Sequence, residues 1–185
     1  MSLPPFIIEK YERKIIGDAH FSDILRTSLL VKHGGLWIDA TVFCTAFPTE
    51  IMNNQLFFYK EAKTSLSPYL CSNWFILSGK NNIIMKNMQK ILFDYWENYN
   101  FAINYFIYHI LLRIVAEHFQ KEWKRIPVYP NCMPLIMQAE FQEKYSEKRY
   151  KELMSISDLH KLTYKFNKVQ PGSFLEYILK NEYEI

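Results

Sequence analysis

The sequence predicts a small α/β fold, and two observations lead to this class. The hydrophobic patterns run in the order helix, strand, strand, strand and then mostly helix, which favours a small mixed sheet covered by helices. A chain of 185 residues can bury a real core, and no repeat, low-complexity segment or linker divides it. We therefore expect residues 1–185 to form a single domain.

The first elements are helices. Two prolines and a helical spacing of apolar residues predict a short amphipathic helix within Leu3–Ile16, not a first strand. A second helix is expected from Asp18 or Ser22, both of which are suitable N-caps. Gly34 and Gly35 end this helix, because glycine adopts the left-handed C-cap conformation without steric cost.

Three strands and then helices follow. The strands are expected at Leu36–Val42, which is apolar enough to be covered on both faces, at Gln55–Glu61 and at Cys71–Leu77. Helices are expected at Asn82–Tyr99, where Asn81 and Asn82 cap the start, and at Phe101–Trp123, Phe141–Leu153 and Ser173–Glu182. The proline-rich stretch Ile126–Pro134 is expected to be irregular.

Asp39 is the residue that does not fit its expected strand. A carboxylate inside a covered strand costs several kcal/mol unless a charge or a hydrogen bond meets it. Strand alternation places Asp39 and Thr41 on one face, where they could offer two oxygens to the same cation. On the preceding helix Asp23 and Arg26 share a face, either as part of the same site or as an ordinary helical ion pair worth a few tenths of a kcal/mol.

The motifs around these residues resemble a known group of enzymes. S-D-x-x-R at 22–26, followed by GG-x-x-x-D at 34–39, is similar to the core motif of DxD glycosyltransferases with the GT-A fold. HFSDILR, GGLWIDATV and the late HKLTYK resemble bacterial capsular polysaccharide synthesis proteins more closely. The metal motif here reads Asp39-Ala40-Thr41, and only residues 1–18 precede the helix, where such enzymes carry a βαβ unit. The resemblance thus implies a GT-A-like nucleotide-diphospho-sugar transferase core that is short at its N-terminus.

The resemblance also implies roles for individual residues. Asp39 would be catalytic and would bind Mn²⁺ or Mg²⁺ together with Thr41 and His160. The donor contacts would be Asp23, Arg26, His160 and Lys161. A departing nucleoside diphosphate develops negative charge, which a metal and cationic side chains stabilise. Asn73 and Trp74 would contact the acceptor, with a purely structural core role as the alternative for Trp74.

Composition limits the partners and the location. A net charge of +3 is too small to indicate nucleic acid binding. Three cysteines without a CxxC pair and the lack of a signal peptide indicate a cytoplasmic protein. The lysine-rich stretch within 141–153 is a solvated face or a contact with the inner face of the cell membrane.

Two functions follow from these features. The first is transfer of a sugar from a nucleotide-sugar donor to an oligosaccharide or lipid-linked saccharide acceptor in capsular polysaccharide synthesis. The second is a catalytically inactive relative that acts as a binding module of the polysaccharide machinery. In either case we expect the sheet edge left open by the short N-terminus to be covered by a second copy, by another protein or by the segment before residue 17.

Overall fold

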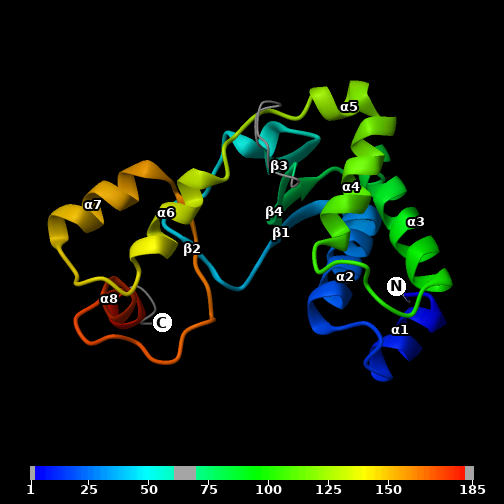
Figure 1. The fold of residues 1–185 in the computed structure, drawn as a ribbon. Coiled ribbons are helices and arrows are strands. Elements are labelled where there is room, and N and C mark those ends of the chain that lie inside the picture. Colours follow the sequence, from blue (N-terminus) through cyan, green and yellow to red (C-terminus); the bar gives the residue numbers. More distant parts are fainter. Residues whose placement is uncertain (1–2, 61–69, 182–185) are drawn as a thin grey trace. The chain divides into compact units, whose positions relative to one another are not determined.

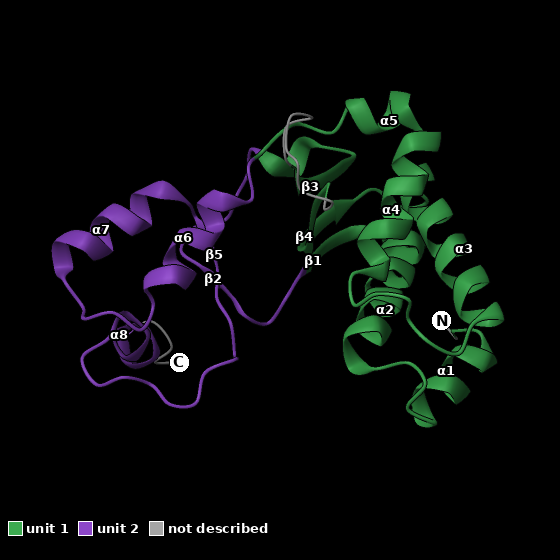
Figure 2. Cartoon of the chain, in the orientation of Figure 1, with its two compact units in different colours: residues 1–37, 51–129 green, residues 38–50, 130–185 purple. Residues whose placement is uncertain are grey.

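The computed structural model describes residues 3–60 and 70–181, which form two compact units (Figures 1 and 2). Unit 1 contains residues 1–37 and 51–129, and unit 2 contains residues 38–50 and 130–185. The described residues hold eight α-helices and two small sheets, which confirms the α/β class. That the two units act together as one glycosyltransferase-like domain stays a prediction.

Unit 1 is built on a three-stranded sheet with the order β1-β4-β3. Strands β3 and β4 are antiparallel, with Phe57 opposite Leu77. The strands are β1 (Gly35–Ile38), β3 (Leu56–Lys60) and β4 (Cys71–Ser78). The helices are α1 (Pro5–Glu12), α2 (Asp18–His33), α3 (Ile83–Asn98), α4 (Ile107–His118) and α5 (Gln120–Lys124), with a short 3₁₀ helix at Ile51–Asn53.

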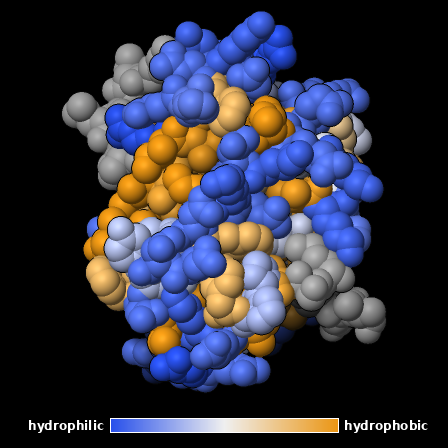
Figure 3. Space-filling view, turned by 90° about the vertical axis from the view of Figure 1, so that its right-hand side faces the viewer, coloured by the Kyte–Doolittle hydropathy of each residue, from blue (hydrophilic) through white to orange (hydrophobic). Residues whose placement is uncertain are grey.

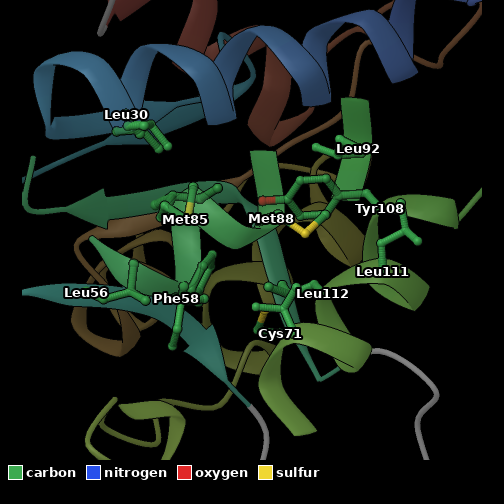
Figure 4. Packing of buried hydrophobic residues seen from close by; sticks show 14 of the residues in the cluster. Leu30, Leu56, Phe58, Cys71, Met85, Met88, Leu92, Tyr108, Leu111 and Leu112 are labelled. Carbon is green, nitrogen blue, oxygen red and sulfur yellow. The ribbon is translucent and has the colours of Figure 1, made fainter. Parts of the chain in front are cut away.

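The core of unit 1 joins this sheet to three helices. Side chains from α2, α3 and α4 point toward those of β3 and β4 (Figure 4). Phe58, Met85 and Met88 are completely buried at its centre. Burial of each such side chain contributes roughly 1.5–3 kcal/mol, so this cluster holds the helices carrying the polar residues described below.

The start of α3 and the end of α2 lie where the sequence predicts them. Asn82 caps α3, and its side-chain oxygen accepts hydrogen bonds from the backbone amides of Ile84 and Met85. Gly34 ends α2 with φ at 70°, and a Cβ there would lie 2.7 Å from the backbone nitrogen of Lys80. Only glycine meets both requirements, so α2 must stop there.

Unit 2 is built on a two-stranded antiparallel sheet of β2 (Val42–Cys44) and β5 (Leu159–Lys161). Val42 lies opposite Lys161, and Phe43 lies opposite His160. Three helices complete the unit: α6 (Cys132–Glu140), α7 (Glu147–Ile156) and α8 (Phe174–Asn181). Its core includes Met137, Leu153, Phe174 and Ile178.

The expected strand at 36–42 is wrong. Strand β1 ends at Ile38, Asp39 to Thr41 form a turn closed by the 3.0 Å bond from Val42 N to Asp39 O, and β2 begins at Val42. The run of β-forming residues is divided between two sheets, because β1 pairs with β4 and β2 pairs with β5. Strand β1 is an edge strand of its sheet. Asp39 therefore lies in a turn and not inside a strand covered on both faces.

Two expected helices were also too long, and one strand was missed. Residues 101–106 precede α4 because the side chain of Asn104 accepts a bond from Phe106 N in a local turn that competes with helix. Helix α7 begins at Glu147 instead of near residue 141, and the three-residue strand β5 gave no pattern of its own. Among the described residues no helix is long and apolar enough to cross a membrane.

Helix α6 was not expected, and its start at Cys132 lies within the stretch 126–134 that was expected to be irregular. The remaining expected elements are confirmed. Helix α1 lies within residues 3–16, and β3, β4, α3 and α8 lie within about one residue of their expected bounds. The described residues before α2 form one helix and no strand.

Candidate functional site

One polar cluster lies in unit 1, where helix α2 meets strand β4. Asp23 and Arg26 are only 7% and 6% exposed, and Arg26 Nε lies 3.6 Å from Asp23 Oδ1. The amide of Asn73 donates a 2.8 Å hydrogen bond to Asp23 Oδ1, and Arg26 Nη1 donates to the backbone oxygen of Asn73. The structure thus brings together three residues that the sequence assigned to donor and acceptor contacts.

The guanidinium of Arg26 has further contacts. Its Nη2 donates to Ser22 Oγ at 2.9 Å and its Nε to Ser22 O at 3.3 Å, while the group lies 5.0 Å above the ring of Trp37. The pair is therefore not an ordinary exposed helical ion pair. It is buried and connects α2 to β4, so Arg26 holds the Asp23 carboxylate in one orientation.

Two side chains on α4 complete the surroundings of this cluster. Burial and the charge of Arg26 lower the pKa of His109 to about 4, so its imidazole is neutral at pH 7. Burial, assisted by the negative charge of Asp23, raises the pKa of the Tyr108 hydroxyl. Sequence reasoning did not assign either residue to the site, because both lie in an apolar stretch whose only signal was the polar interruption at His109.

Trp74 lies apart from this cluster. Adjacent residues on a strand point to opposite faces, so Trp74 leaves β4 on the other side from Asn73. Its ring is 5% exposed and stacks on Tyr59 with a centroid distance of 4.9 Å. Its packing matches the structural alternative, and its role as an acceptor contact stays a prediction.

A second polar cluster lies in unit 2, where the turn after β1 meets β5. The ammonium of Lys161 lies 3.6 Å from Asp39 Oδ2, donates to Thr41 Oγ1 and donates to Leu162 O at 3.3 Å. The side chains of Lys161 and Asp39 are 18% and 26% exposed. One carboxylate, one hydroxyl and one ammonium thus converge within reach of solvent, which is a suitable set for binding an anion or an anion with its metal.

His160 occupies the opposite face of β5 from Lys161. Its ring lies 5.8 Å from that of Phe43 and the residue is 1% exposed, with no hydrogen-bond partner at Nε2 in the structure. Burial lowers the pKa of His160 to about 4, although the nearby Asp158 carboxylate opposes the shift. The imidazole is neutral, packs beside the core of unit 2 and is not brought together with the Lys161 ammonium.

A divalent cation fits part of this second cluster. Within residues 3–60 and 70–181 no three His, Cys, Asp or Glu side chains form a metal site. Mg²⁺ and Mn²⁺ prefer oxygen ligands, and Mg²⁺ in nucleotide sites is commonly held by one or two protein groups together with the phosphates. Asp39 and Thr41 have the oxygen atoms that such a site needs. The metal roles of Asp39, Thr41 and His160 stay predictions.

Comparison with protein families identifies a match over most of the chain. The family model described as capsular polysaccharide synthesis protein matches residues 1–178. This chain belongs to that family. The matched residues include both polar clusters, and no curated protein matches the sequence.

Proposed function

We propose that this protein transfers a sugar from a nucleotide-sugar donor to an oligosaccharide or lipid-linked saccharide acceptor in capsular polysaccharide synthesis, in the cytoplasm. The observation that carries the proposal is the convergence of Asp39, Thr41 and Lys161 in unit 2. Family membership supports the biosynthetic context. A GT-A-like core is the fold this proposal implies.

The unit 2 cluster supplies the chemistry that a nucleoside diphosphate leaving group needs. The Lys161 ammonium, partly withdrawn from water, would stabilise the negative charge that develops on the departing phosphate. Asp39 and Thr41 would hold Mn²⁺ or Mg²⁺, which supplies further stabilisation of the same charge when bound. His160 would serve as a neutral neighbour that shapes the strand beneath the site.

The unit 1 cluster supplies hydrogen-bonding groups suited to sugar hydroxyls. The Asp23 carboxylate can accept hydrogen bonds from hydroxyls in addition to that from Asn73, and Arg26 keeps it oriented. Asn73 would position a sugar beside it, while the buried ring of Trp74 would act on the acceptor only through the strand it packs.

The test is calorimetric binding of UDP and GDP to the whole chain, with and without Mn²⁺. We expect saturable binding that Mn²⁺ strengthens, and Lys161→Met should weaken it at least tenfold because the phosphate loses a charged hydrogen bond. Lys165→Met is the matched control, since Lys165 is exposed and lies nearby in sequence. Absence of saturable binding at millimolar nucleotide would overturn the proposed transfer reaction.

A second function has one observation in its favour. The Lys161 ammonium contacts both oxygen groups that would bind the metal. A cation of the chain itself therefore already lies beside them. A catalytically inactive binding module of the polysaccharide machinery would need nothing more. Nucleotide binding that Mn²⁺ leaves unchanged, without sugar transfer to any capsular acceptor, would favour this alternative.

A further inference from the structure

Unit 1 exposes a set of large apolar side chains, close together in the sequence, that neither function uses. Phe101, Ile103 and Tyr105 on the segment before α4 are 58%, 61% and 61% exposed, far more than such side chains usually are. We call the whole set the apolar surface, and it comprises Tyr99, Phe101, Ile103, Tyr105, Phe106, Ile110 and Ile114. Figure 3 views the side of the molecule formed by the helices of unit 1, where hydrophobic side chains gather among hydrophilic ones.

The backbone beneath the apolar surface is held in place by hydrogen bonds within the unit. The Tyr95 hydroxyl donates to Phe101 O at 2.8 Å and accepts from Ile103 N at 3.0 Å. His20 Nε2 lies 3.1 Å from Tyr105 O. Because these backbone groups already have partners, moving the segment out of water does not leave them unsatisfied.

The apolar surface continues along α4. Phe106, Ile110 and Ile114 recur every four residues and so share one face of the helix, while Leu111, Leu112 and Val115 on the other face are buried in the core. An aromatic side chain offers on the order of 150–250 Å², so the four aromatic members, about half exposed, together with the three Ile make a patch of several hundred Å². Patches of this size mark interaction sites.

The charges of this region favour one kind of partner. No carboxylate occurs between Tyr99 and Ala116, and Arg113 is paired with Glu117. The net positive charge comes from the end of the segment, where Lys121, Lys124 and Arg125 stand against Glu122. Exposed Phe, Ile and Tyr together with a net positive flank are the features of surfaces that insert into the headgroup region of anionic bilayers. We propose that the apolar surface docks on an anionic lipid bilayer, with Phe101, Ile103 and Tyr105 entering it.

The lysine-rich helix α7 is a weaker membrane contact than its composition indicates. Arg149 binds Glu140 at 2.6 Å and Glu152 at 2.9 Å, and Lys151 binds Glu147 at 2.6 Å. These cations are paired within unit 2, whereas the apolar side chains of 99–114 face solvent. The docking surface therefore belongs to unit 1.

The experiment measures binding of the whole chain to phosphatidylcholine vesicles with and without the anionic lipid phosphatidylglycerol. We expect binding that the anionic lipid strengthens and that largely persists at about 0.5 M NaCl, because apolar insertion is not screened. The triple variant Phe101→Ser, Ile103→Ser and Ile114→Ser should reduce the partition coefficient more than tenfold.

The matched control removes three exposed apolar side chains elsewhere. Ile83→Ser, Val128→Ser and Leu179→Ser replace residues that are 43%, 51% and 48% exposed and should leave vesicle binding unchanged. In a separate variant, Ile103→Trp, brominated lipids should quench the added fluorescence. Failure of the natural chain to bind anionic vesicles, or equal loss in both triple variants, would overturn the proposal.

A second copy of the chain is the competing occupant of the same surface. Light scattering of the natural chain and of the Phe101, Ile103 and Ile114 variant distinguishes the two. A monomer in both samples agrees with lipid docking. A dimer that only the variant converts to a monomer would show that the apolar surface binds another copy, and the bilayer proposal would be wrong.

Discussion

The two polar clusters contain ion pairs of the same length in very different surroundings. Arg26 Nε lies 3.6 Å from Asp23 Oδ1 in unit 1, and Lys161 Nζ lies 3.6 Å from Asp39 Oδ2 in unit 2. The side chains of the first pair are at most 10% exposed, while those of the second are 18% and 26% exposed. Distance alone therefore says little about what either pair does.

The surroundings indicate a division of roles. The Asp23–Arg26 pair has hydrogen bonds to Asn73 and Ser22, so losing either partner would leave a buried charge uncompensated. The Asp39–Lys161 pair lies beside a turn that water reaches. Each charged group can therefore leave its partner and bind a charged ligand instead. The first pair connects α2 to β4 and holds the Asp23 carboxylate in the orientation that the proposed sugar contact needs, and the second is suited to binding a charged ligand.

Arg26→Met should produce the largest effect. It leaves the buried Asp23 carboxylate without its cation, so we expect the free energy of unfolding to fall by about 3–5 kcal/mol. Urea denaturation followed by circular dichroism measures this loss. The exposed pair Arg113–Glu117 offers a matched control, since Arg113→Met should cost less than about 0.5 kcal/mol. Equal losses in the two variants would refute the structural role of Arg26.

Acid should destabilise unit 1 through His109. Its pKa is near 4 in the folded protein and near 6.5 when unfolded. Between pH 4 and 6.5 the imidazole is therefore mostly protonated in the unfolded chain and mostly neutral in the folded protein. Stability is therefore complete above about pH 6.5 and declines as the pH falls toward 4. Between pH 7 and 5 we expect His109 to contribute a loss of about 1–2 kcal/mol that His109→Gln removes, while the buried His160 contributes a loss of its own in both proteins. A denaturation series over this range that is identical for both proteins would exclude this contribution.

Asp39→Asn should separate binding from stability. Because Asp39 is partly exposed in a turn, the unfolding free energy should change by less than about 1 kcal/mol. Mn²⁺-dependent binding of a nucleoside diphosphate should nevertheless weaken at least tenfold, since one oxygen ligand loses its charge. Calorimetry and thermal unfolding of the same sample report both quantities. An unstable variant that binds nucleotide normally would show that Asp39 is structural.

The smallest effect concerns the coupling within the second pair. A double-mutant cycle on Asp39 and Lys161 should give an interaction energy of about 0.2–1 kcal/mol that declines in about 1 M NaCl. The same cycle on Asp23 and Arg26 should give a larger energy that salt hardly changes, because the pair is buried. Reversal of this order in denaturation measurements would contradict the division of roles.

Local chemistry made much of the fold predictable from the sequence. The Asn82 cap, the glycine stop at Gly34 and the apolar periodicity of β3, β4 and α3 each act within a few residues, so their elements were expected close to where they lie. The break at Asp39 was not predictable in this way. It depends on β2 pairing with β5, and that partner is far away in the chain and only three residues long.

The site shows the same limit. Helical spacing placed Asp23 and Arg26 together, and this is confirmed, but the contact with Asn73 comes from β4 lying beside α2. Thr41 and Lys161 do meet beside Asp39, although the strand alternation used to place Asp39 and Thr41 was wrong. Burial of His160 among apolar neighbours could not be deduced from a three-residue strand.

The pairing of β2 with β5 has a consequence for how the protein is made. Lys161 contacts Thr41 across 120 positions of the sequence, and ribosomes add roughly 5–20 residues per second. For about 6–24 s after Thr41 is synthesised, β2 therefore has no partner strand, whereas unit 1 needs nothing beyond residue 129. The proposed phosphate site is therefore assembled only after unit 1, so a nascent chain cannot bind nucleotide there until Lys161 has been synthesised.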